Sequence, residues 1–243
     1  MLFDIDVDEH PNMTLPQRYN WLSDFVYGGI DGSVTTFAVI AGVQGAALPI
    51  SIILILGFAN LFADGFSMAT GKYLSDKALL EEFEKIRQIE FKHLETKFHH
   101  ERGEVEDILR GYGIHGEILD QATDQIIANP EGWVDIMMRN EFNMTHENIN
   151  PLKGAFATFT AFLAIGFIPL AGYTFQSFFS VSQDMIFLIT CFTTAIALFI
   201  VGTIKSLFVM KRWFAAGFET VFFGGIAASI AYSVGFLLRG MVA

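Results

Sequence analysis

Five long apolar stretches constrain this chain more than any other feature of its sequence. They cover about residues 27–48, 50–74, 154–175, 185–209 and 213–238. Each is long enough to cross roughly 30 Å of hydrocarbon as a helix. Helices are required because a bilayer offers no water to backbone groups that lack partners. The composition agrees, since 52% of the 243 residues are hydrophobic and 26 are phenylalanine. We therefore expect an all-α integral membrane protein with five transmembrane helices.

A polar insert separates the second stretch from the third. Its first part, "LSDKALLEEFEKIRQIEFKHLETKFHHERGEVEDILRGYG", has apolar residues at helical spacing and continues the second span. Gly103 and the Gly111–Gly113 pair are candidate breaks, and Asn129-Pro130 is expected to end a further helix. We divide the chain into an N-terminal tail (1–26), spans one and two (27–75), a helical metal-binding insert (76–150) and spans three to five (151–243).

Lysine and arginine positions predict the orientation in the membrane. They occur before the first span, at both ends of the insert and in the fourth turn, at Arg18, Lys72, Lys77, Lys153, Lys211 and Arg212. The first and third turns contain neither residue. We therefore expect the N-terminus and the insert to be cytosolic and the C-terminus to lie outside.

The charge excludes one class of partner and bears on the location. A net charge of −11 disfavours binding to nucleic acid. The acidic beginning "MLFDIDVDEHPNM" lacks the basic region of a signal peptide. We expect a prokaryotic plasma membrane, with a vacuolar membrane as the alternative.

Polar residues interrupt the second span on one side. Asn60, Asp64 and Met68 are spaced by four and share a helix face, and Ser67 lies close to it. Asp31 lies about one turn inside the first span. An ionised carboxylate in the membrane costs about 2.5–3.5 kcal/mol, so it is functional by default. Carboxylate, amide and thioether groups together predict a divalent-cation site, and the sulfur favours transition metals over Mg²⁺ or Ca²⁺. The alternative is that these residues cap helix ends near the interface.

Glu219 and Lys205 are the other ionisable residues in apolar stretches. They can pair with each other, or Glu219 can carry protons. Lys205 can also extend its charge to the interface.

The insert offers three sets of metal-ligand residues, each able to project from one helix face. They are Glu90 with His93, Glu101 with Glu104, and Met137 and Met138 with Glu141. A Glu-x-x-His pair with further carboxylates is typical of metal sites in helical bundles. A charged helix face is also often merely solvated, and paired methionines are often core.

Several motifs together resemble the vacuolar iron transporter family. They are "DFVYGGIDGSVTTFAVIAGV", "NLFADGFSMATGKYLS" and "WVDIMMRNEF", and the resemblance covers roughly residues 20–240. It implies a homodimeric exporter of Fe²⁺, and often Mn²⁺, that takes part in iron homeostasis. Metal would leave the cytosol in exchange for protons along the dimer interface, without a prosthetic group.

The resemblance also implies roles for residues in the membrane. The family's first-span carboxylate falls on Asp31, its second-span methionine on Met68 and its second-span acidic site on Asn60. Asp64 follows Asn60 by one turn, so either residue can be the ligand.

In the insert, the implied metal ligands are Glu90, His93, Glu101, Glu104, Met137, Met138 and Glu141. His93 departs from the family's usual Glu, and imidazole suits Fe²⁺ well. His99 and His100 can add ligands to this set, but we expect them to belong to a solvated face.

The sequence is also compatible with two rival functions. One is a membrane-anchored di-iron enzyme, which usually needs two Glu-x-x-His motifs where this chain has one. The other is a metal sensor, which would leave Asp31 and Asp64 without a purpose. We therefore expect a transporter and not an enzyme.

Overall fold

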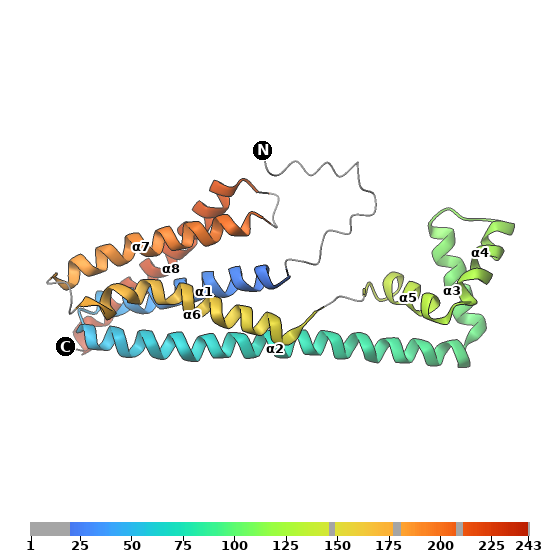
Figure 1. The fold of residues 1–243 in the computed structure, drawn as a ribbon, viewed down its shortest axis with the longest axis horizontal. Helices are drawn as coiled ribbons and strands as arrows, with labels where there is room; N and C mark the ends of the chain where they lie inside the picture. Colours follow the sequence, from blue (N-terminus) through green and yellow to red (C-terminus); the bar gives the residue numbers. More distant parts are fainter. Residues whose placement is uncertain (1–19, 146–148, 177–180, 208–210, 243) are drawn as a thin grey trace. The chain divides into compact units, whose positions relative to one another are not determined.

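The computed structural model describes residues 20–145, 149–176, 181–207 and 211–242, and this part of the chain is built from helices (Figure 1). The helices are α1 (Asn20–Gly45), α2 (Ile50–Thr96), α3 (Phe98–Gly111), α4 (Glu117–Ile127), α5 (Pro130–Asn140), α6 (Pro151–Thr174), α7 (Gln183–Lys205) and α8 (Trp213–Val242). The predicted all-α class is confirmed. Arg18, in the predicted tail, and Val209, the predicted end of the fourth span, lie outside the described residues.

Within the described residues, five helices are long and apolar enough to cross a membrane, as predicted. They are α1, α2, α6, α7 and α8. Helix α2 is 47 residues long, so the second span and the beginning of the insert form one helix. The chain divides into two compact units, of which the first joins residues up to Leu74 with those from Asn150 onward. The second unit is Ser75–Ile149.

Small residues bring α1 against α6 in the first unit. A Cβ atom on Gly28 would lie 2.4 Å from the carbonyl oxygen of Thr158, and one on Gly32 would lie 2.5 Å from that of Phe162. These glycines are therefore required by the close approach of two backbones, a common device where helices pack inside membranes. The contact fixes the turn of α1 that carries Asp31.

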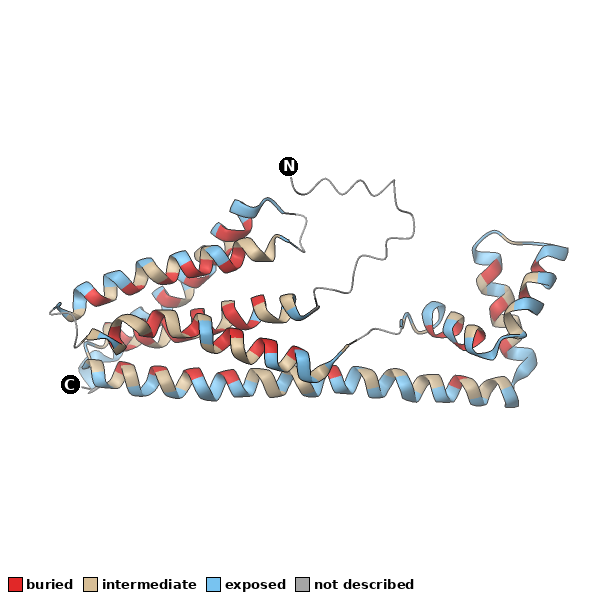
Figure 2. Ribbon diagram, viewed as in Figure 1, coloured by how far each residue is buried: buried red, intermediate tan, exposed pale blue. Residues whose placement is uncertain are grey.

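The core of the first unit joins α1, α2, α6 and α7. Its buried side chains include Ile40, Ile53, Phe162 and Ile186. Figure 2 shows buried residues concentrated on α1 and α6, whereas exposed residues recur along the length of α2. Large side chains such as Phe62 are exposed on the membrane part of α2. One copy of the chain therefore leaves an apolar face of α2 open.

The insert has a separate small core. Val105, Leu109, Leu119, Trp133 and Met137, from α3, α4 and α5, are buried together there. The chain reverses between α3 and α4 through Gly113 and Gly116, which have φ angles of 86° and 67°. Glycine adopts such angles without steric cost, and the predicted break at the Gly111–Gly113 pair is confirmed.

The two other helix boundaries of the insert differ in how well the sequence predicted them. Asn129 accepts a hydrogen bond from Gly132 N–H and Pro130 begins α5, which confirms the predicted stop and start. The predicted break at Gly103 is wrong, because Gly103 lies inside α3. The chain instead breaks at Lys97, between α2 and α3, where φ is −131° and ψ is 29°.

Candidate metal centre

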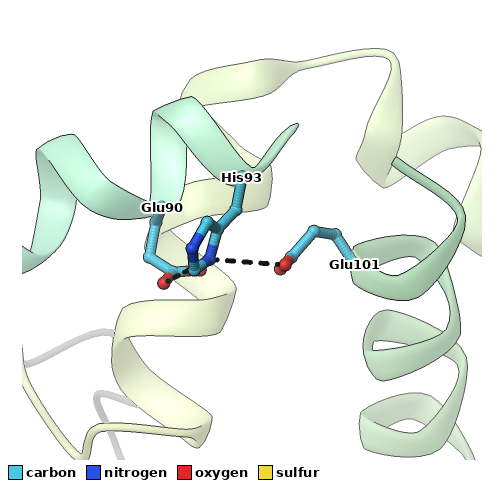
Figure 3. A group of neighbouring side chains, drawn as sticks. All are labelled: Glu90, His93 and Glu101. Carbon is cyan, nitrogen blue, oxygen red and sulfur yellow. Dashed lines mark ion pairs between the residues drawn. The ribbon is translucent and has the colours of Figure 1, made fainter. Parts of the chain in front are cut away.

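Three predicted ligands of the insert converge at the end of α2. Glu90 and His93 lie one turn apart on α2, and Glu101 points back toward them from the first turn of α3 (Figure 3). His93 Nδ1 is 3.4 Å from Glu90 Oε1 and 3.5 Å from Glu101 Oε1. One ligand atom from each residue lies within 4.8 Å of the other two. The break at Lys97 creates this arrangement, because it redirects the chain so that the first turn of α3 faces the last turns of α2.

The two carboxylates of this group are buried without full compensation. Glu90 and Glu101 are each 2% exposed. The Oε2 atom of each is buried and has no hydrogen-bond partner among the described residues. Leaving a buried charged oxygen unpaired is costly, so such pairs of oxygens are expected to face a cation. This second observation distinguishes the group from an ordinary acidic surface.

The group opens into a cavity of about 290 Å³. Further polar side chains line it: Lys97, His100, Glu104 and Glu141. His100 Nε2 lies 3.2 Å from Glu104 Oε1. His100 is exposed, as expected, and it also lines the cavity. Its spacing of four residues from Glu104 is consistent with this ion pair.

Burial and mutual repulsion raise the pKa values of several carboxyl groups at the cavity. Burial raises the pKa of Glu90, and the negative charge of Glu141 raises it further. Burial and the neighbouring Glu101 raise the pKa of Glu104 in the same way. The pKa of Glu141 is raised by burial and by Glu104. The cavity therefore holds more negative charge than its own cations balance, which favours a bound metal ion.

The predicted methionine ligands lie elsewhere in the insert. Met137 and Met138 are buried, and Met137 packs in the apolar core with Val105 and Trp133. Neither side chain belongs to the described residues that line the cavity. Their role as metal ligands stays a prediction.

In the first unit, a short series of hydrogen bonds links two of the predicted membrane residues. The Thr35 hydroxyl donates to the carbonyl oxygen of Asp31 at 2.8 Å. The Asn60 amide donates to Thr35 Oγ1 at 3.5 Å. Asn60 on α2 is therefore tied to the turn of α1 that carries Asp31.

The remaining polar residues of α2 are less enclosed. Asp64 and Ser67 are exposed in a single chain, whereas Met68 is half-buried against the core of the first unit. Asp64 lies one turn after Asn60 on α2, and Asn60 bonds to the turn of α1 that carries Asp31. The structure thus brings Asp31, Asn60 and Asp64 into one neighbourhood.

Glu219 lies in a network of lysines. Both of its carboxylate oxygens accept hydrogen bonds from Lys211 Nζ at 3.1 Å. Lys205 Nζ lies 3.8 Å from Glu219 Oε2, so the predicted pairing of these two residues is present.

Comparison with known proteins gives one consistent answer. Residues 22–236 match the profile of the VIT family. A Toxoplasma gondii protein named vacuolar iron transporter is 33% identical over 229 residues, which span 92% of this chain and 76% of its own length. Vacuolar iron transporter 1 of Arabidopsis thaliana is 32% identical over 212 residues, covering 86% of this chain and 82% of its own. Vacuolar iron transporter 2 of Oryza sativa is 29% identical, covering 87% and 85%. The resemblance predicted from the motifs is confirmed, and the chain belongs to the VIT family.

Proposed function

We propose that the protein exports a divalent transition metal, Fe²⁺ or Mn²⁺, from the cytosol by exchanging it for protons. The protein is a membrane protein of a transporter family and not an enzyme. The rival di-iron enzyme or sensor finds no support in the relatives compared, which are named iron transporters. The family therefore supports transport, while the direction, the ions and the coupling are our proposal.

One observation carries the proposal: the Glu90–His93–Glu101 group, whose two glutamates are buried and each have a carboxylate oxygen without a partner among the described residues. Carboxylates with one imidazole suit Fe²⁺ and Mn²⁺. The distribution of lysine and arginine supports a cytosolic location for this insert. The group would therefore capture metal on the side from which it is exported.

Asp31, Asn60, Asp64, Ser67 and Met68 would carry the ion through the membrane. Their oxygens can replace part of the water around the ion, and the Met68 thioether disfavours Mg²⁺. Protonation of Asp31 or Asp64 from an acidic outer side would weaken their hold on the metal. Release would then be coupled to proton entry.

The exposure of Asp64 and Ser67 supports our proposal of a homodimer. In a single chain both face outward from a membrane-spanning helix. A carboxylate facing lipid costs about 2.5–3.5 kcal/mol, and a second copy packed on this face of α2 would remove that contact. Glu219 is a weaker candidate for proton transfer, because Lys211 and Lys205 already balance its charge.

Metal flux into proteoliposomes with an acidic lumen tests this proposal. We expect Fe²⁺ or Mn²⁺ uptake that needs the pH gradient and is lost in Asp31→Asn. Asp184→Asn is the matched control, because it removes the same charge from an exposed residue at the beginning of α7. Uptake that ignores the gradient would refute proton exchange. Metal binding by the purified protein without any uptake would instead favour a function as a metal sensor.

The dimer is tested by cross-linking. In a Cys191→Ser background, Ala63→Cys on the exposed face of α2 should be joined to its copy by a bis-maleimide. Ile196→Cys, which is exposed on α7, is the control. Equal cross-linking of both variants would argue against the α2 interface.

A further inference from the structure

Lys97 connects the two helices of the metal group through its backbone. It occupies the break between α2 and α3. Its N–H donates to the carbonyl oxygen of His93 at 2.7 Å, and its own carbonyl accepts from Glu101 N–H at 3.2 Å. The two helices that carry the ligands are thus joined through this residue.

The Lys97 side chain returns to the same group. Its ammonium lies 3.3 Å from Nε2 of His93 and lines the cavity with Glu90 and Glu101. An ammonium group can only donate hydrogen bonds, so Nε2 of His93 must be the acceptor. In neutral imidazole the proton is then on Nδ1, where it faces the Glu90 and Glu101 oxygens.

A metal ion requires the opposite tautomer. Nδ1 is the His93 atom that Glu90 and Glu101 surround, so an ion bound by all three residues takes its lone pair from Nδ1. The imidazole proton then moves to Nε2, which becomes a donor. Two donors, Nε2–H and the Lys97 ammonium, cannot share a hydrogen bond, and the ammonium also repels the cation.

We propose that Lys97 is a built-in competitor of the metal ion. In the empty site it supplies positive charge and holds His93 in the Nδ1–H form, and it must move away when a divalent cation binds. This inference rests on the proposed capture of metal by Glu90, His93 and Glu101. It predicts a site that is weaker than its ligands alone would make it, which suits a site that must release its ion onward.

Calorimetric titration of the purified full-length protein with Mn²⁺ tests the proposal. Lys97→Gln should bind Mn²⁺ about tenfold more tightly, the change that about 1.4 kcal/mol produces. Lys92→Gln removes the same charge from an exposed position on α2 and should bind like the original protein. Lys97→Arg keeps the charge and should retain the weaker binding.

The outcomes separate this inference from the proposed function. Unchanged or weaker binding by Lys97→Gln would overturn the competitor role, provided that Glu101→Gln reduces binding. Unchanged binding by Glu101→Gln would instead refute the metal group itself.

The tautomer of His93 provides a second test, because a lysine with only a structural role would not determine which ring nitrogen carries the proton. Histidine-selective ¹⁵N labelling, with His93→Gln to assign the signal among the 6 histidines, should show Nδ1–H in the empty protein. Zn²⁺, a diamagnetic probe, should convert it to Nε2–H. An Nε2–H form in the empty protein would overturn the proposal.

Discussion

Replacing Glu101 by Gln should change the stability of the insert in opposite directions with and without metal. The Glu90 and Glu101 ligand oxygens lie within 4.8 Å of each other. Two unit charges at that separation repel by about 3 kcal/mol at an effective dielectric constant of about 20. Glu101→Gln removes this repulsion and keeps the shape of the side chain. Because His93 and Lys97 partly offset it, we expect the empty insert to gain about 1–2 kcal/mol.

The loss of a charged ligand acts the other way when metal is present. Outer-shell residues of metal sites contribute about 10–100-fold in affinity, so a ligand should contribute at least about 100-fold. In excess metal, the stabilisation by binding then falls by about 2.7 kcal/mol. The metal-bound variant should therefore unfold at a lower temperature than the metal-bound original.

Trp133 allows this to be measured in the full chain. It is one of 3 tryptophans, and it is 2% exposed in the core of the insert. In a Trp21→Phe, Trp213→Phe background its fluorescence reports the insert alone. For a domain of this size, 1 kcal/mol shifts the midpoint by about 4–8 °C. With EDTA, Glu101→Gln should unfold at a higher temperature, and with Mn²⁺ at a lower one. A lower midpoint in EDTA, with an unchanged shift on adding Mn²⁺, would refute the reasoning.

Three further predictions follow from the two units. Met137→Ala should lower the free energy of unfolding of the insert by about 2–5 kcal/mol and Met137→Leu by less than about 1.5; the same fluorescence assay checks this. Because the pKa of Glu90 is raised in the folded insert, the folded state binds the proton more tightly. The empty insert should therefore lose stability as pH rises through that pKa, so its midpoint in EDTA should be higher at about pH 5 than at about pH 7.5, and Mn²⁺ should abolish this difference. Gly32→Leu should abolish Fe²⁺ flux and lower the midpoint of thermal unfolding, because even the Cβ atom of the leucine would lie 2.5 Å from a backbone oxygen of α6. Gly225→Leu, where nothing lies within 4 Å, should keep both.

The helices were predictable because their signals are local. Long apolar runs require helices in a bilayer, and Asn129-Pro130 combines a capping side chain with a residue that suits a first turn. The pairing of Lys205 with Glu219 was also predictable, because pairing two opposite charges lowers the cost of placing them in apolar stretches. Helical spacing does not predict the convergence of Glu90 and His93 with Glu101, because it places residues on a face without saying what that face meets. Only the family resemblance implied that these three residues act together.

The break at Lys97 shows why the rest of the site escaped sequence reasoning. Gly103 has the lower helix propensity, yet it continues α3. A glycine in a helix costs roughly 1 kcal/mol, which the buried contacts of Val105 and Leu109 on the same helix can outweigh. Lys97 carries no breaking signal, so its place beside His93 depends on how α3 packs.

For Asp64, the sequence and the structure each supply part of the argument. Its spacing from Asn60 and Met68 identifies a polar face of α2, but it does not say whether that face is enclosed by α1 and α6. In the structure the three residues have different environments: Asn60 bonds to Thr35, Met68 packs on the core, and Asp64 is exposed. A membrane span cannot leave a charge in contact with lipid at no cost. Asn60 and Met68 are therefore enclosed within one chain, whereas Asp64 needs a neighbour that the described residues do not supply, which is why we propose an ion path at a contact between two copies.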